Sequence, residues 1–290
     1  MSQFVLQTPA KLNLTLRVLH RRKDGFHNIV STFFRLPVHE TLTITPVFED
    51  SSGNDHLQVH GEKIGGRNIL FDVLAMARTK GVSIPSLAME LWKTFPPGAG
   101  TAAGSGNASA LAGWLEETWG MQISIDELAK LGSDVPFLRG HELISLRGGV
   151  GEIVLEKNIP LRRSFSILVM IPDFASDTAG AYAALDQKRK SAAMVFTEEE
   201  ASAEARRTIQ SLQNGETVGL LPNDFTDVLI SRHSEYERVF GLFRSCGARC
   251  WGITGSGSGC FAFFDERHYA AKAGRILGQS RGIRKIFIME

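Results

Sequence analysis

The segment 95–107 is rich in glycine, alanine and serine and lies between a predicted strand at 87–95 and a predicted helix at 105–118. Small residues let the backbone curve closely around a ligand. The first N–H groups of a helix have no partner within the helix, and the helix dipole makes that end positive. A phosphate group suits this arrangement. We therefore expect segment 95–107 to bind a nucleotide or a phosphate ester.

Three other interpretations of segment 95–107 fit less well. It is not a Walker A loop, because no Gly-Lys-Ser/Thr follows. Gly98-x-Gly100-x-x-Ala103 could be a dinucleotide fingerprint, but this needs a second strand ending in an acid about 20 residues on. The chain offers Glu116 and Glu117 inside a helix instead. A flexible linker is disfavoured by the apolar residues on both sides.

Two charged residues outside this segment could take part in catalysis. Residues 11–18 alternate between polar and apolar side chains, which predicts a half-buried strand with Lys11 and Asn13 on its polar face. Such a face is usually solvated, but these two side chains could also serve a cleft. Asp134 follows a predicted helix end at Gly132 and precedes Val-Pro, which stiffens a loop. Although a lone aspartate there is more often a cap, Asp134 is the best candidate acid or base.

The pattern along the chain predicts an α+β protein. Asn68–Lys80 has helical periodicity, and Ser124-Ile-Asp-Glu127 is a capping box that opens a short helix. Strands are expected at 28–36, 40–47, 142–147 and 152–155. From residue 165 the order is strand, helices, two strands, helix, strand, which is the split βαβ order. The predicted elements of this part are 165–171, 178–185, 197–212, 227–244, 249–254, 260–264, 266–277 and 283–289.

Composition narrows the functional classes. The 290 residues are 43% hydrophobic and 22% charged, with a net charge of +1, so neither a nucleic-acid partner nor a membrane partner is expected. Three cysteines do not make a disulfide framework, and Cys246-x3-Cys250 lacks the second ligand pair of a zinc site. No apolar run approaches the ~18 residues of a spanning helix, and no signal peptide is recognised at the N-terminus. These features predict a cytoplasmic protein.

Five segments, in this order along the chain, resemble the motifs of the GHMP kinases. Two of them, Asp24-Gly-Phe-His27 and Leu131-Gly-Ser-Asp-Val-Pro136, resemble in particular the GHMP kinases that act on 4-diphosphocytidyl-2-C-methyl-D-erythritol. The resemblance covers nearly the whole chain and is weakest at 186–220. The other three segments are Pro9-Ala-Lys-Leu-Asn-Leu14, the small-residue segment 95–107 and Thr254-Gly-Ser-Gly257.

The resemblance implies a two-domain GHMP kinase fold of the α+β class. A ribosomal-S5-like N-terminal domain would span residues 1–158, and a ferredoxin-like C-terminal domain would span residues 159–290. The implied reaction transfers the γ-phosphoryl group of ATP, with Mg²⁺, to the C2 hydroxyl of a cytidine-diphosphate-linked methylerythritol. This step belongs to the non-mevalonate route to isoprenoids.

The resemblance also implies a role for individual residues. Asp134 would be the general base, and Lys11 would keep it ionised and share charge with the phosphoryl group. Phe26 would stack on the cytosine and His27 would hydrogen-bond its edge. Ser105 would be a ligand of Mg²⁺ in addition to binding the nucleotide. The expected nucleotide-binding residues are Asn68, Pro96, Gly98, Gly100, Thr101, Gly104, Ser105 and Asn107. The expected substrate-binding residues are Asn13, Phe26, His27, Thr178, Tyr182, Gly255 and Ser256, the last two helping to close the substrate cleft.

The chain departs from the family pattern at several positions. The family usually has tyrosine at position 26, where Phe26 keeps the ring but not the phenol. In the glycine-rich loop, alanine replaces glycine at three positions, Thr101 replaces leucine and Gly106 replaces serine. An alanine forced to a positive φ costs roughly 1 kcal/mol. The three alanines are Ala99, Ala102 and Ala103.

Two alternatives remain open at this point. Another GHMP kinase, acting on mevalonate or homoserine, is disfavoured by Asp24-Gly-Phe-His27, because those substrates have no base to stack. A non-catalytic binding protein with the same fold is favoured only by the altered loop and is disfavoured by the presence of both Lys11 and Asp134.

Overall fold

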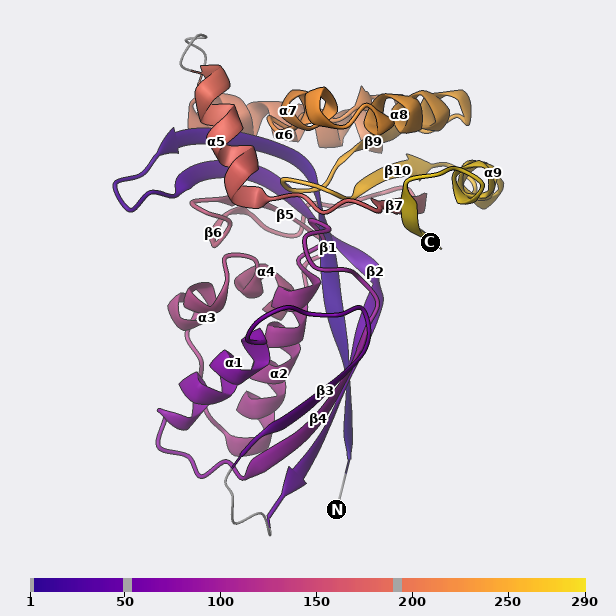
Figure 1. Cartoon of the computed structure of the whole chain (residues 1–290). Coiled ribbons are helices and arrows are strands. Elements are labelled where there is room, and N and C mark those ends of the chain that lie inside the picture. Colours follow the sequence, from indigo (N-terminus) through magenta and orange to yellow (C-terminus); the bar gives the residue numbers. More distant parts are fainter. Residues whose placement is uncertain (1–2, 49–53, 190–194) are drawn as a thin grey trace. The chain divides into compact units, whose positions relative to one another are not determined.

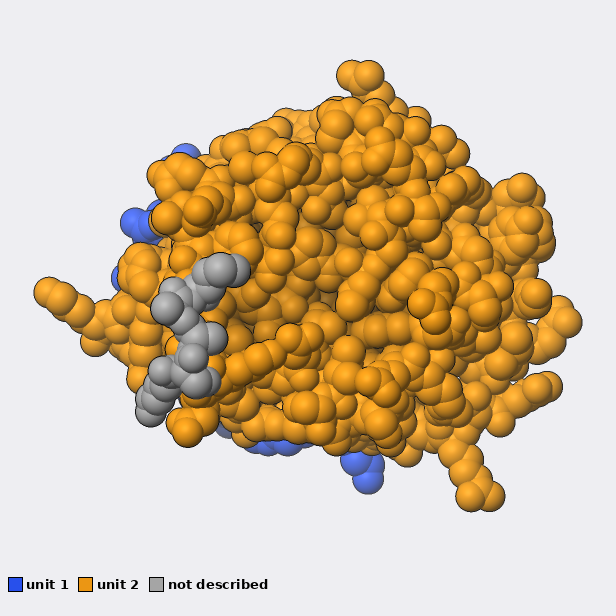
Figure 2. All heavy atoms as spheres, turned by 90° about the horizontal axis from the view of Figure 1, so that it is seen from above, with its two compact units in different colours: residues 1–11, 35–97, 102–141 blue, residues 12–34, 98–101, 142–290 orange. Residues whose placement is uncertain are grey.

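The computed structural model describes residues 3–48, 54–189 and 195–290, which form two compact units coloured separately in Figure 2. Unit 1 comprises residues 1–11, 35–97 and 102–141, and unit 2 comprises residues 12–34, 98–101 and 142–290. Strands β1 (Phe4–Arg21) and β2 (His27–Val47) each contribute residues to both units. The units therefore differ from the domains 1–158 and 159–290 expected from the sequence, and that domain boundary stays a prediction.

In unit 1, helices pack against a sheet formed by the second half of β2, β4 (Ser86–Lys93) and β3 (His56–Gly61). Strand β4 pairs antiparallel with β2 over Thr41–Val47 and parallel with β3. Helices α1 (Ile69–Arg78) and α2 (Ala103–Trp119) lie along these strands (Figure 1). Their apolar faces share one buried cluster with the sheet, which includes Leu42, Ile44, Leu70, Val73, Leu87, Leu91, Leu111 and Leu115.

Local sequence signals account for most helix boundaries in unit 1. The side chain of Asn68 caps α1, and Ser124 and Glu127 form the predicted capping box at the start of α3 (Ile125–Leu131). Two elements of unit 1 were not predicted. Strand β3 has no clear alternation, and α4 (Val135–Arg139) has five residues, too few for a periodic pattern.

In unit 2, one sheet continues from the first half of β2 through β5 (Ile144–Gly148) to β6 (Ile153–Glu156). A second sheet has the order β11-β7-β10-β9-β8, and its first four strands are antiparallel neighbours. This is the strand order of a split βαβ unit, so the ferredoxin-like C-terminal prediction is confirmed. The strands are β7 (Ser166–Pro172), β8 (Gly219–Leu220), β9 (Cys250–Ile253), β10 (Cys260–Phe264) and β11 (Ile283–Met289).

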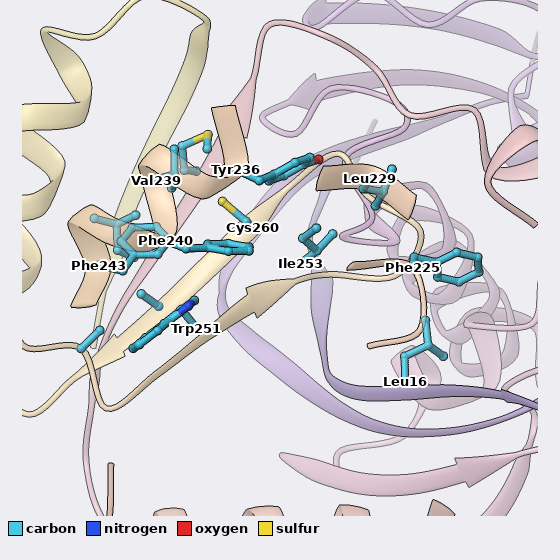
Figure 3. Packing of buried hydrophobic residues seen from close by; sticks show 14 of the residues in the cluster. Leu16, Phe225, Leu229, Tyr236, Val239, Phe240, Phe243, Trp251, Ile253 and Cys260 are labelled. Carbon is cyan, nitrogen blue, oxygen red and sulfur yellow. The ribbon is translucent and has the colours of Figure 1, made fainter. Parts of the chain in front are cut away.

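Among the described residues, five helices belong to unit 2, and α8 (Glu235–Ser245) packs its aromatic residues onto the second sheet. Figure 3 shows this core, in which Tyr236, Phe240 and Phe243 lie against Trp251 and Cys260. All three cysteines are buried and free. None of the described helices is long and apolar enough to cross a membrane. The helices are α5 (Thr178–Arg189), α6 (Glu198–Gln213), α7 (Thr226–Arg232), α8 (Glu235–Ser245) and α9 (Arg267–Gly278).

Three predicted elements were wrong in their extent. The strands expected at 28–36 and 40–47 form one strand, β2, because Pro37 is exposed and needs no hydrogen-bond partner there. The single helix expected at 227–244 is two helices, α7 and α8. His233 breaks the helix with extended backbone, and its ring stacks on Phe174 with 3.7 Å between centroids.

Candidate active site

Lys11 and Asp134 form an ion pair within unit 1. Lys11 lies on β1, and Asp134 precedes α4 at the N-cap position. The Asp134 side chain makes no capping hydrogen bond, and its Oδ2 lies 3.6 Å from Lys11 Nζ. The side chain of Lys11 is 5% exposed and that of Asp134 is 23% exposed. The predicted proximity of the two side chains is confirmed, whereas their catalytic roles remain to be tested.

The environment of Lys11 is unfavourable for its charge. Burial lowers the pKa of Lys11 below 10.5, and the carboxylate of Asp134 only partly offsets this effect. The pair therefore places a poorly solvated ammonium beside a carboxylate that solvent can reach. Such a carboxylate can accept a proton from an alcohol, and such an ammonium can stabilise negative charge that develops nearby.

Helix α2 begins without a side-chain cap. Ala102 at the N-cap has left-handed backbone (φ 51°, ψ 27°) and the first turn holds no acidic residue. The 17-residue helix thus presents amide groups and its positive dipole end with no carboxylate to neutralise them. In the described part of the chain, no atom outside the adjacent backbone lies within 4 Å of the position that a Cβ on Gly104 would take. An anion could approach the backbone there, as the sequence predicts.

Ser105, in the first turn of α2, lies close to the segment that carries Asp134. A Cβ on Gly132 would lie 3.4 Å from Ser105 Oγ, so the hydroxyl faces the turn two residues before Asp134. Among the described residues there is no group of three or more His, Cys, Asp and Glu that could hold a metal ion. Protein sites for Mg²⁺ often use one or two side chains together with substrate phosphates. Ser105 fits that pattern.

Other predicted nucleotide-binding residues of unit 1 have structural partners. Asn107 is buried in α2, where its Oδ1 accepts a hydrogen bond of 2.6 Å from Thr8 Oγ1. Asn68 caps α1 by accepting a hydrogen bond from Leu70 N at 3.0 Å. Pro96 is buried after the end of β4. For Asn107 and Asn68, contact with a nucleotide stays a prediction beside an observed hydrogen bond. For Pro96 it stays a prediction.

Gly106 allows α2 to approach β1 closely. A Cβ at this position would lie 1.7 Å from Pro9 O, so no side chain fits without moving the helix. The replacement of the family's serine by Gly106 is therefore matched to the packing of α2 in this chain.

In unit 2, residues 98–100 are held by a turn at 254–259. Ser258 N donates to Gly98 O at 2.9 Å, and Gly259 N donates to Ala99 O at 3.2 Å. Gly98 and Gly100 have positive φ, and a Cβ on Gly100 would lie 2.2 Å from a backbone oxygen of the turn. Glycine is thus required at position 100. The carbonyl groups of all three loop residues are therefore engaged by the turn.

Thr254 joins several predicted site residues of unit 2. Its hydroxyl donates to Gly100 O at 3.0 Å and accepts from Asn13 N at 3.1 Å. The side chain of Asn13 is turned to the neighbouring strand, where Nδ2 donates to Ser31 Oγ at 2.8 Å. Thr101 is only 2% exposed and offers little surface to a nucleotide. The polar face predicted for β1 is therefore mostly buried and hydrogen-bonded rather than solvated.

The turn also contacts the start of α5. Thr178 Oγ1 and Ser256 Oγ are 2.9 Å apart, and Ser176 Oγ donates to Ser256 O at 2.5 Å. The structure thus brings together the predicted substrate-binding residues Thr178 and Ser256, with Gly255 beside them. Their contact with substrate stays a prediction.

A second group of predicted substrate-binding residues forms around His27. The His27 ring is stacked on Tyr182 with 5.0 Å between centroids, and its Nε2 donates to Asp186 Oδ1 at 2.9 Å. Phe26 is 65% exposed, so its ring is accessible to a planar ligand. A proton on Nε2 that is donated to Asp186 leaves Nδ1 as the acceptor in the neutral form of the ring.

Sequence reasoning missed two residues that shape this site. Asp186 follows Tyr182 by one helical turn, just as Tyr182 follows Thr178, so this spacing was a usable signal. Asn223 donates from Nδ2 to Ile253 O and Gly255 O, both at 2.9 Å. It lies in a loop after Pro222, where no local pattern marks it.

Comparison with known families and proteins gives consistent matches. Residues 68–141 match the family described as GHMP kinases N terminal domain, and residues 203–283 match GHMP kinases C terminal. The 4-diphosphocytidyl-2-C-methyl-D-erythritol kinase of Porphyromonas gingivalis is 31% identical over 271 residues, covering 91% of this chain and 93% of the relative. That of Leptospira interrogans is 30% identical over 275 residues, covering 88% and 89%.

Solved structures share the fold over nearly the whole chain. A crystal structure of 4-(cytidine 5'-diphospho)-2C-methyl-D-erythritol kinase matches with a TM-score of 0.77 at 23% identity, covering 98% of each chain. The homoserine kinase of Cytophaga hutchinsonii matches with a TM-score of 0.65 at 15% identity, covering 100% of this chain and 95% of that one. At these identities the matches establish the fold alone, and the predicted α+β GHMP kinase fold is confirmed.

Proposed function

Because the chain belongs to the 4-diphosphocytidyl-2-C-methyl-D-erythritol kinase family of GHMP kinases, we propose that it phosphorylates the C2 hydroxyl of that cytidine diphosphate compound with ATP. The observation that carries the proposal is the Lys11–Asp134 pair, in the same unit as the uncapped start of α2. These are the parts that phosphoryl transfer needs: a base, a cation and a phosphate cradle.

In the proposed reaction, Asp134 accepts the proton of the C2 hydroxyl while the hydroxyl oxygen forms a bond to the γ-phosphorus of ATP. The bond between the γ-phosphorus and the bridging oxygen breaks, and ADP leaves with the electron pair. The ammonium of Lys11 stabilises charge on the transferring group, and the amides at the start of α2 bind phosphate oxygens. Mg²⁺ supplies charge neutralisation on the phosphates when bound, and Ser105 is the residue that would contact it.

The cytosine would be recognised in unit 2. Phe26 is exposed and can stack on the base, which is worth about 1–3 kcal/mol in nucleic-acid binding proteins. Cytosine carries a donating amino group on its edge. When the ring is neutral and donates its Nε2 proton to Asp186, His27 Nδ1 is suited to accept from that group. A mevalonate or homoserine substrate would make no use of these residues.

The direct test is to incubate the purified protein with Mg-ATP and 4-diphosphocytidyl-2-C-methyl-D-erythritol and to locate the new phosphate by phosphorus NMR. We expect a phosphomonoester at C2. No product in this incubation, together with transfer to mevalonate or homoserine in parallel incubations, would support another GHMP kinase activity.

One observation favours a second candidate, a nucleotide-binding homologue with weak catalysis. Ala102 adopts the left-handed backbone conformation that favours glycine, at the start of the proposed phosphate cradle. Thermal melting with millimolar Mg-ATP distinguishes binding from its absence, since a ligand well above its Kd must raise the melting temperature. We expect a rise together with product formation. A rise with little product would support the second candidate, and no rise with no product would contradict both.

We also propose a cytoplasmic location. Cys246, Cys250 and Cys260 are buried free thiols, and burial raises the pKa of Cys250 and Cys260. Unpaired thiols of this kind are common in reducing compartments. Fractionation of the native host, with the protein recovered outside the cytoplasmic fraction, would contradict this location.

A further inference from the structure

Three consecutive residues between β8 and α7, Asn223, Asp224 and Phe225, contact different parts of the unit 2 site. We propose that this segment, here called the positioning segment, sets ATP affinity through Asn223 and cytidine affinity through Phe225. The proposal rests on the proposed function, because it assumes that both ligands bind. None of the three residues needs to touch a ligand for it to hold.

Asn223 uses its whole side-chain amide to join its own segment to the end of β9 and to the turn at 254–259. Its Nδ2 donates to Gly255 O and to Ile253 O, and its Oδ1 accepts from Phe225 N at 2.9 Å. Asn223 is also buried. A buried amide with both donor hydrogens and its acceptor engaged has one favourable orientation. The start of the turn is therefore fixed to the positioning segment.

The same turn determines the shape of the glycine loop. It donates to the carbonyl oxygens of residues 98, 99 and 100, as described above. A displacement of Gly255 would move Thr254, whose hydroxyl contacts Gly100 O. Asn223 thus acts on residues 98–100, the part of the loop assigned to nucleotide binding, through a short chain of hydrogen bonds.

Phe225 acts on the other ligand through aromatic contacts. Its ring is fully buried and meets Tyr182 edge to face, with 4.8 Å between centroids and 78° between planes. Tyr182 is in turn stacked on His27, which is assigned to the cytosine. Figure 3 shows Phe225 in the unit 2 core near Leu16. Phe225 therefore contacts Tyr182, and Tyr182 contacts His27.

Asp224 keeps the segment itself in place. Its Oδ1 accepts from Arg17 at 2.6 Å, and its Oδ2 accepts from Arg189 at 2.6 Å and from Val18 N at 2.8 Å. Backbone bonds on either side add to this, because Leu16 N donates to Pro222 O and Leu16 O accepts from Asp224 N. These bonds tie the segment to β1 and to the end of α5. A segment held this firmly can fix the positions of the turn at 254–259 and of Tyr182.

The experiment measures two dissociation constants by calorimetry for each variant. The probes are Mg²⁺ with adenylyl imidodiphosphate, a non-hydrolysable ATP analogue, and cytidine 5'-diphosphate. Asn223→Asp keeps the shape and Oδ1 but removes both donated bonds, so we expect ~10-fold weaker binding of the ATP analogue and ~2-fold or less change for cytidine 5'-diphosphate. Phe225→Leu should give the reverse pattern, because it removes the ring contact with Tyr182.

Two control variants test for general loosening of the fold. Phe243→Leu removes the same kind of fully buried ring from the same core cluster, where it meets Phe264. Thr226→Val alters a buried hydroxyl next to the segment, and within the described part of the chain that hydroxyl has no hydrogen-bond partner. We expect both controls to leave both dissociation constants within ~2-fold of wild type, while Phe243→Leu lowers the melting temperature.

The inference would be overturned if Asn223→Asp and Phe225→Leu weakened both probes equally or neither, or if a control reproduced either pattern. Should Phe225→Leu fail to fold, Phe225→Met, which keeps more of the volume, replaces it with the same expected pattern. Because binding needs no turnover, these results do not depend on catalysis. If wild-type protein binds both probes but forms no product, the proposed function is contradicted. The changes in dissociation constants expected for Asn223→Asp and Phe225→Leu still apply.

Discussion

Lys11 Nζ lies 3.6 Å from Asp134 Oδ2, and the lysine is the more deeply buried of the two. The pair joins β1 to the segment before α4, where Asp134 lies at a helix N-cap yet makes no capping bond. A capping role would have turned the carboxylate toward the helix amides. Its orientation toward a buried cation instead is the feature on which the catalytic proposal depends.

Replacing Lys11 with methionine should remove most activity while making the protein more stable. Burial lowers the pKa of Lys11, and a lysine with a lowered folded-state pKa destabilises the fold at neutral pH. That destabilisation disappears as the pH rises toward the unfolded value of 10.5. We expect Lys11→Met to be more stable than wild type at pH 7, with a smaller advantage at pH 10.

Guanidinium unfolding of both proteins at the two pH values measures this difference. A Lys11→Met protein that is less stable at pH 7, by an amount that does not change with pH, would show that burial of the ammonium is not the controlling factor.

Ala102→Gly should stabilise the protein. Ala102 has a φ of 51°, which glycine adopts at no steric penalty, so we expect a gain of about 1 kcal/mol in the free energy of unfolding. The matched control is Ala103→Gly at the next position, where the backbone is helical and glycine should instead cost about 0.5 kcal/mol. Equal shifts in the denaturation midpoints of the two variants would contradict the assigned strain at position 102.

Gly106→Ser should destabilise the protein, although serine is the usual family residue there. The added Cβ would lie 1.7 Å from Pro9 O, so α2 must move away from β1, at about 2–3 kcal/mol. Gly104→Ser is the control, because among the described residues no neighbouring atom lies within 4 Å of its Cβ position. We expect its unfolding free energy to stay within about 0.5 kcal/mol of wild type. Wild-type stability in Gly106→Ser would mean that this contact is not tight.

Phe26→Ala should weaken binding of the cytidine substrate with no effect on the KM for ATP. Loss of one base-stacking ring is worth roughly 1–3 kcal/mol, or about 5- to 150-fold in KM. Because Phe26 is exposed, the fold should be unaffected. Phe48→Ala, at another exposed phenylalanine, is the control and should leave both KM values unchanged. An unchanged KM for the cytidine substrate in Phe26→Ala would exclude the stacking role.

Much of the fold could be predicted because local signals agreed with tertiary packing. Asn68 and Ser124 cap helices whose apolar faces are periodic, and both helices form where expected. The signals failed where a tertiary contact decided the structure. His233 breaks a periodic helix because its ring stacks on Phe174, and the polar residue Thr15 is buried because it bonds Thr32 on the neighbouring strand.

The site was predicted less completely than the fold. Residues in recognisable segments, such as His27 and Thr178, were found because the resemblance pointed to them. Asp186 could have been found by extending the one-turn spacing of Thr178 and Tyr182 along α5. Asn223 could not, because its role depends on the distant turn at 254–259 that its amide contacts, and no local pattern encodes that contact.

The most direct test of the central claim is the kcat of Asp134→Asn with Mg-ATP and 4-diphosphocytidyl-2-C-methyl-D-erythritol. Asparagine keeps the shape of the side chain but cannot accept the hydroxyl proton as a base. Asp126→Asn, at an exposed carboxylate in the first turn of α3, is the control and should turn over like wild type. The account predicts that Asp134→Asn loses ~10²-fold or more in kcat while remaining folded. Turnover near the wild-type rate would contradict it.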